Sequence, residues 1–132
     1  MLKAEIRSYR KYCKYKAELL DRLDELWYEL TGVKGIRYDK EPAAFNPTIT
    51  VERKHSLMDK IDYYQSELDR VDRQIRHIDK ILDRLDPEDL KIINYFLIEG
   101  HQLEEAERKY YLTASGMSRH IDAILLKVMN SQ

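Results

Sequence analysis

The sequence is poor in the residues that end helices or cross-link chains. Its 132 residues include four glycines, three prolines and a single cysteine, Cys13. So few glycines and prolines predict long, uninterrupted elements. One cysteine excludes an internal disulfide and fits a reducing compartment. The sequence has no run of about 18 apolar residues and no apolar signal-peptide core in its charged first fifteen residues, so we expect a cytoplasmic protein without a membrane partner.

The residues that build catalytic and metal sites are equally scarce. Four histidines lie far apart and never at the spacing of metal ligands, so the sequence predicts no zinc site. There is no glycine-rich phosphate loop, and the acidic groups alternate with bases at helical spacing, which is typical of charged helix faces. Cys13 has no histidine partner, and we expect a buried, inert thiol. We therefore expect no enzyme, no catalytic residue, no cofactor and no metal.

Charge is unevenly distributed along the chain. The 23 lysines and arginines nearly balance the 24 acidic residues overall. Residues 1–16, however, carry six bases against one acid, a net charge of +5, whereas residues 17–85 and 86–132 are each at −3. The N-terminal bases are interleaved with tyrosines, a pattern that suits binding to nucleic acid or to an acidic protein surface. We favour the plainer interpretation that these bases are solvated, because Tyr9 belongs to an apolar heptad series.

Apolar residues in the middle of the chain alternate steps of four and three residues over four heptads. They are Leu57, Ile61, Tyr64, Leu68, Val71, Ile75, Ile78, Leu82 and Leu85. This spacing keeps one apolar seam facing a partner helix. We expect the helix to be capped by Thr50 and to end near Leu85, because Pro87 disfavours helix in the residue before it. Its length would then be roughly 54 Å.

The first thirty residues repeat the heptad spacing. The seam positions are Leu2, Ile6, Tyr9, Cys13, Lys16, Leu20, Leu23, Trp27 and Leu30. Gly32 follows, where a helix C-cap is expected. Residues 31–50 form a loop long enough to fold the two helices back as an antiparallel hairpin or coiled coil over residues 1–85. The alternative is that each seam pairs with a second copy of the chain.

Residues 86–132 predict three shorter helices. The first begins at Pro87 and ends at Gly100, with Leu90, Ile93, Leu97 and Ile98 facing inward. The second spans roughly Gln102–Tyr110. Thr113 caps the third, whose buried stripe consists of Met117, Ile121, Ile124 and Val128. No sustained period-2 pattern occurs anywhere, so the chain is expected to be all-α.

Two short helices, a tight turn and a further helix across them form the layout of a helix-turn-helix. The segment from Leu85-Asp86-Pro87 through Leu112-Thr113-Ala114-Ser115 to His120-Ile121 resembles the region-4 helix-turn-helix of sigma factors. With Lys34-Gly35-Ile36-Arg37-Tyr38-Asp39-Lys40-Glu41-Pro42 between two charged helices, it is similar to the small ArpU-like and RinA-like regulators of phages and prophages. The resemblance implies a transcriptional regulator that binds promoter DNA and switches on late genes.

The resemblance also locates the turn of the motif. That turn needs a left-handed residue and normally carries glycine. In this sequence the position falls on Tyr111, or on Tyr110 if the motif is shifted by one residue. Glu107 occupies the place where the family usually has a small alanine facing the following helix.

The candidate DNA-binding residues are Lys109, Thr113, Ser115, Ser118 and Arg119. If Met117 and Ile121 are buried, a 100° step places Arg119 on the opposite face, where it would bridge guanine O6 and N7. Ser115 and Ser118 would reach phosphates or base edges, and Lys109 the DNA backbone. The plain alternative is that Arg119 is a solvated residue near Asp122. Gly116 either allows close approach to the groove or marks the start of the helix.

The leading hypothesis is therefore a phage-type regulator that binds double-stranded DNA through its C-terminal helices. The alternative is a coiled-coil interaction module that docks on another protein, such as RNA polymerase, without specific DNA binding. In either case we expect a homo-oligomer, most simply a dimer, because two apolar seams and an outward Leu126 expose more apolar surface than one hairpin covers.

Overall fold

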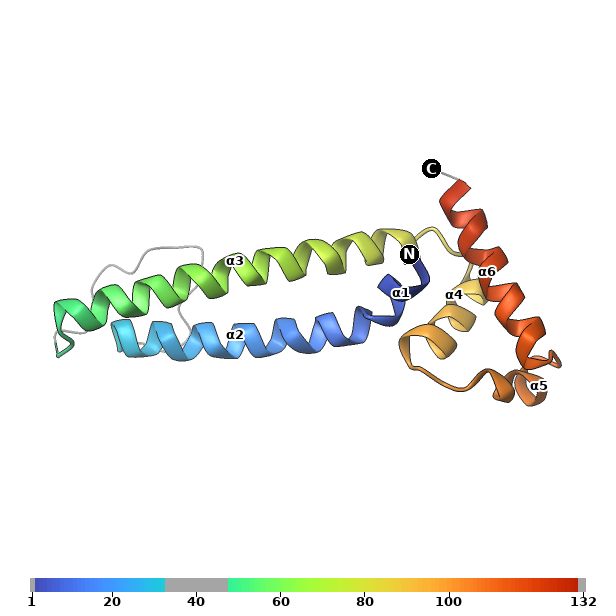
Figure 1. Cartoon of the computed structure of the whole chain (residues 1–132), viewed down its shortest axis with the longest axis horizontal. Helices are drawn as coiled ribbons and strands as arrows, with labels where there is room; N and C mark the ends of the chain where they lie inside the picture. The colour runs from blue at the N-terminus through green and yellow to red at the C-terminus, as the bar shows by residue number, and fades with distance from the viewer. Residues whose placement is uncertain (1, 33–47, 131–132) are drawn as a thin grey trace. The chain divides into compact units, whose positions relative to one another are not determined.

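The computed structural model describes residues 2–32 and 48–130, all of which form helices or short connections (Figure 1). No strand occurs in these residues, so the prediction of an all-α chain is confirmed. The elements in chain order are α1 (Leu2–Arg7), α2 (Tyr9–Thr31), α3 (Val51–Leu82), α4 (Pro87–Ile93), a π-helical turn η1 (Asn94–Ile98), a 3₁₀ turn η2 (Leu103–Glu105), α5 (Ala106–Lys109) and α6 (Ala114–Asn130). The motif at 34–42 and most of the predicted loop 31–50 lie outside the described residues.

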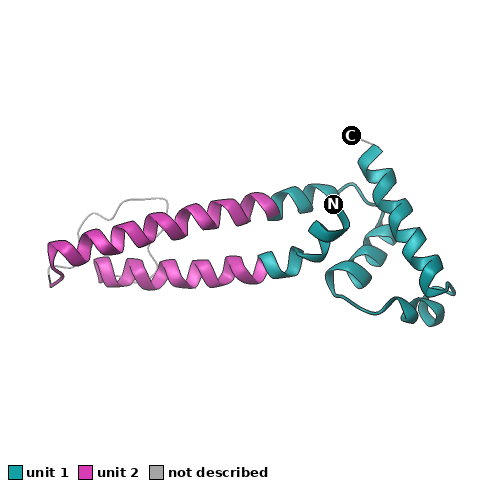
Figure 2. Cartoon of the chain, viewed as in Figure 1, with its two compact units in different colours: residues 1–12, 75–132 teal, residues 13–74 magenta. Residues whose placement is uncertain are grey.

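The chain divides into two compact units, which Figure 2 colours separately. Residues 13–74 form one unit. Residues 1–12 and 75–132 form the other, so both chain ends belong to the same unit. This division cuts across α2 and α3 and differs from the boundary at residue 86 that the sequence suggested, because the first helix packs with the C-terminal helices.

Within residues 13–74, α2 and α3 lie side by side and antiparallel (Figure 1). The Tyr15 hydroxyl donates a hydrogen bond to Glu67 at 3.1 Å near one end. At the other end, Arg53 pairs with Glu29, and its Nε lies 2.9 Å from the carboxylate oxygen. The buried side chains of this unit are all apolar: Leu19, Leu23, Leu26, Trp27, Leu30, Leu57, Ile61, Leu68 and Val71.

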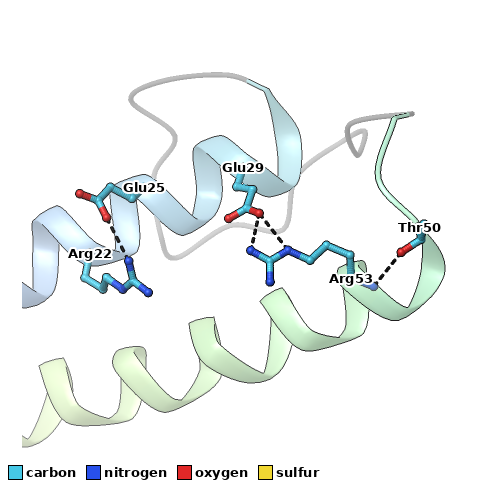
Figure 3. Close-up of polar contacts among 5 residues, drawn as sticks. All are labelled: Arg22, Glu25, Glu29, Thr50 and Arg53. Carbon is cyan, nitrogen blue, oxygen red and sulfur yellow. Dashed lines mark hydrogen bonds and ion pairs between the residues drawn. The ribbon is translucent and has the colours of Figure 1, made fainter.

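Both predicted helix ends of this hairpin are present. The Thr50 hydroxyl accepts the backbone N–H of Arg53 at 3.1 Å, which caps α3 (Figure 3). Figure 3 also shows Glu29 contacting the guanidinium of Arg53. Gly32 follows α2 with φ of +77° and donates its N–H to Tyr28, as a helix C-cap requires.

The N-terminal helix is interrupted, which the heptad pattern did not predict. The break falls at Ser8, between α1 and α2. The Ser8 hydroxyl donates to the carbonyl of Ala4 at 3.0 Å, and its N–H is shared between Ala4 and Glu5. Such back-bonding bends a helix. The buried position in the next turns is Leu19, with Leu20 only half-buried, so the seam shifts by one residue there.

The long helix also ends earlier than predicted. α3 stops at Leu82 instead of Leu85, and its last backbone bonds are of the tighter 3₁₀ type, from Arg84 to Ile81 and from Leu85 to Leu82. The cause is Pro87, the first residue of α4, which holds Asp86 in an extended conformation. Ile75 and Leu68, chosen as mid-seam positions, are each 8% exposed.

The core of the other unit is built from α1, the end of α3 and the C-terminal helices. Its buried side chains are Ile6, Ile78, Ile81, Ile92, Ile93, Phe96, Leu97, Ala106, Met117, Ile121, Ile124, Leu125 and Val128. The predicted stripe on α6 is therefore buried. Leu90 was predicted to face inward, but it is 38% exposed, because α4 turns Ile92 and Ile93 to the core instead.

Candidate nucleic-acid interface

The turn that precedes α6 contains a non-glycine residue in the left-handed region. Tyr111 has φ of +60°, whereas Tyr110 has φ of −124°. Of the two positions that the sequence left open, the left-handed one is Tyr111. Its side chain is 89% exposed, so no packing compensates for this backbone conformation, which costs an L-residue roughly 1–2 kcal/mol.

The start of α6 is fixed by a side-chain cap. The Thr113 hydroxyl accepts the backbone N–H of Gly116 at 3.0 Å, as the capping prediction required. A Cβ at Gly116 would lie 3.0 Å from this same oxygen, so glycine leaves room for the cap. Of the two explanations for Gly116, this geometry favours the helix start. The Thr113 hydroxyl therefore serves as the N-terminal cap of α6.

The outer face of α6 carries the predicted reading residues. Ser115, Arg119, Asp122 and Leu126 are exposed, opposite the buried Met117. The Arg119 Nε lies 3.4 Å from the backbone oxygen of Ser115, a long contact that leaves its terminal nitrogens to solvent. Arg119 has no ion-pair partner among the described residues.

The acidic residue on this face is paired. The Lys3 Nζ lies 3.1 Å from the Asp122 carboxylate, which joins α1 to α6 across 119 positions of the sequence. A carboxylate beside Arg119 would repel DNA phosphates, and the lysine offsets its charge. The plain alternative, that Arg119 is a solvated residue near Asp122, stays open, because both side chains are exposed on α6.

Lys109 lies in a separate cluster around Tyr95. Its Nζ is 3.8 Å from the centroid of the Tyr95 ring, a cation–π contact. The His101 ring stacks on the same tyrosine with centroids 3.9 Å apart, and sterics place the two on opposite faces of the ring. Burial and the Glu105 carboxylate raise the pKa of Tyr95 above its ordinary value. A shallow hollow of about 360 Å³ is lined by Tyr95, Glu105, Arg108 and Lys109.

The five predicted residues thus fall into four environments. Ser115 and Arg119 share the outer face of α6, Thr113 caps that helix and Ser118 is half-buried on its flank. Lys109 packs on Tyr95 instead. Glu107, at the place where the family usually has a small alanine, is exposed, and the neighbouring Ala106 is fully buried.

Two features of this surface were missed from the sequence. The Lys3–Asp122 pair joins distant residues, and no local spacing reveals it. The Tyr95–His101 stack depends on the π-helical turn η1, which has no signature in the sequence. π-Helical turns often occur at functional sites, so η1 is a candidate functional feature of this unit.

Comparison with known proteins adds no relative. The chain matches no family model, no curated protein and no solved structure. Within the part of the chain that the structure describes, no helix is both long and apolar enough to cross a membrane. In the same residues, no three histidine, cysteine or acidic side chains gather closely enough to hold a metal ion.

Proposed function

We propose that the chain is a transcription regulator of the phage or prophage type that binds promoter DNA by inserting α6 into the major groove. The observation that carries this proposal is the outer face of α6, where Arg119 is exposed beside Ser115 and has no ion-pair partner among the described residues, while Lys3 offsets the charge of Asp122. A helix whose one stripe is buried and whose other side offers an arginine suits reading of guanine in the major groove. The short α5 and the left-handed Tyr111 between it and α6 support the helix-turn-helix layout.

Selection from a randomised duplex library by the full chain tests the proposal. We expect an enriched sequence that contains guanine, and Arg119→Ala should relax the preference at one position by about 1–3 kcal/mol without changing the circular-dichroism spectrum. Arg73→Ala is the matched control, because Arg73 is also exposed on a helix but lies in the hairpin unit. No enrichment by the full chain at low salt would refute the proposal.

Lys109→Ala separates backbone contact from base reading. If Lys109 binds a phosphate, its loss weakens all sequences alike and makes the salt dependence shallower. If its role is only to cover the Tyr95 ring, the variant loses stability and keeps the salt dependence of the parent. Titration of one selected duplex at several salt concentrations distinguishes these outcomes.

A second candidate is a docking module for another protein, such as RNA polymerase. It is favoured by the two apolar side chains on the outer part of α6, Leu126 at 59% and Met129 at 52% exposed. An apolar interface depends weakly on salt, whereas binding to DNA phosphates weakens steeply. Arg119→Ala would leave such docking intact, and Leu126→Lys would abolish it.

A further inference from the structure

Three bases at the junction of α1 and α2 lie exposed in the same unit as α6. They are Arg7, Arg10 and Lys11. Arg10 and Lys11 follow Arg7 by three and four residues, across the break at Ser8 that separates α1 from α2. The three charges therefore lie within five consecutive residues of the chain.

The charges of Arg7, Arg10 and Lys11 are not matched by an ion pair in the part of the chain that the structure describes. Three carboxylates that contact this N-terminal segment have other partners: Glu5 pairs with His77 at 3.4 Å, Asp79 accepts from the Tyr9 hydroxyl at 2.6 Å and Asp122 pairs with Lys3 at 3.1 Å. Three uncompensated charges within residues 7–11 repel one another, so the segment gains from an external polyanion.

The position of the segment beside α6 decides which polyanion fits. Lys3, on α1, touches Asp122 on the outer face of α6. Arg7 ends α1, so at 1.5 Å per residue it lies roughly 6 Å along this helix from Lys3. The major groove is about 12 Å wide, so a helix lying in it has a phosphate backbone on each side, roughly 6 Å from the midline of the groove.

We propose that Arg7, Arg10 and Lys11 bind the phosphate backbone of duplex DNA at the edge of the groove that α6 occupies. The inference rests on the proposed function and adds a second contact surface to it. It also supplies the positive charge that residues 86–132, with eight acids against five bases, lack. Arginine suits this role because its planar guanidinium matches phosphate oxygens in a bidentate manner.

The test is the salt dependence of binding by the full chain to a labelled 20-base-pair duplex of mixed sequence. Each phosphate contact contributes about 0.9 to the slope of log K against log salt. Arg7→Gln combined with Lys11→Gln should reduce the magnitude of that slope by about 2. The matched control is Lys60→Gln combined with Arg73→Gln, which removes the same charge from exposed positions on α3 and should leave the slope within about 0.5 of the parent.

The outcomes separate this inference from the proposed function. An unchanged slope in the Arg7/Lys11 variant, while Arg119→Ala still alters sequence preference, overturns the inference alone. An equal fall in the control variant also overturns it, because the effect would then be one of net charge. Absence of DNA binding by the parent refutes both proposals. Poly-glutamate that competes as well as duplex DNA would point to an acidic protein surface and overturn the inference. Circular dichroism of each variant confirms that the helices are retained.

Discussion

Replacing Tyr111 by glycine should stabilise the protein, although it removes an aromatic ring. Tyr111 has φ of +60°, which costs an L-residue roughly 1–2 kcal/mol, and glycine adopts this region freely. The ring is 89% exposed, so its loss removes almost no buried surface. Glycine also gains freedom in the unfolded chain, which costs about 0.4–1 kcal/mol. The balance is a stabilisation of about 0.5–1 kcal/mol.

A thermal melt followed by far-ultraviolet circular dichroism measures this change. For a chain of this length, the stabilisation corresponds to a rise in Tm of about 2–4 °C. Tyr111→Ala is the matched control: it removes the same ring and keeps the left-handed L-residue, so its Tm should stay near that of the parent.

Tyr110→Gly provides the opposite comparison. Tyr110 is half-buried, and its ring centroid lies 6.0 Å from that of Phe96, so this variant should melt lower than the parent. A Tm for Tyr111→Gly at or below that of Tyr111→Ala would show that the turn is not held in the left-handed region, and the helix-turn-helix interpretation would lose its structural support.

Three other changes have defined outcomes. Ile75→Asp places a charge at a position that is 8% exposed and should cost several kcal/mol or unfold the chain, whereas Ser66→Asp, exposed on the same helix, should melt like the parent. The predicted homo-oligomer is tested by light scattering at tens of micromolar protein: a monomeric parent contradicts it, and Leu126→Lys should lower the mass of an oligomer that packs through the exposed apolar side chains of α6. Arg70 and the Tyr15 hydroxyl lower the pKa of Glu67, so its contribution to stability is present above the ordinary glutamate pKa and is lost as the pH falls through the lowered value. Glu67→Gln should therefore make the loss of stability on acidification less steep. A variant whose stability falls with pH in the same way as that of the parent would contradict this role of Glu67.

Local signals in the sequence located the helices well. Thr50 and Thr113 were both chosen as caps, and each accepts the backbone N–H three residues later. Such caps depend on a few neighbouring residues, so spacing alone reveals them. The heptad spacing placed Ile75 in the buried seam for the same reason: periodicity reports which face of a helix is apolar.

The misplaced details have physical causes beyond local sequence. Heptad spacing cannot anticipate the bend at Ser8, because a hydroxyl that bonds its own helix competes with regular geometry. Leu90 was assigned to the core by its apolar side chain, yet Ile92 and Ile93 fill the core from that helix and leave Leu90 38% exposed. The helical register is chosen by the packing of the whole unit, which one helix does not encode by itself.

The net charge around the candidate interface depends on which parts of the chain fold together. Counted along the chain, residues 86–132 are acidic, and DNA binding by them alone would be opposed by repulsion. The folded unit has a different composition, because residues 1–12 join it and bring four bases against Glu5. Ile6 is fully buried in the shared core, so these bases are held there by apolar packing. The N-terminal helix thereby supplies both part of the core beneath α6 and positive charge beside its outer face.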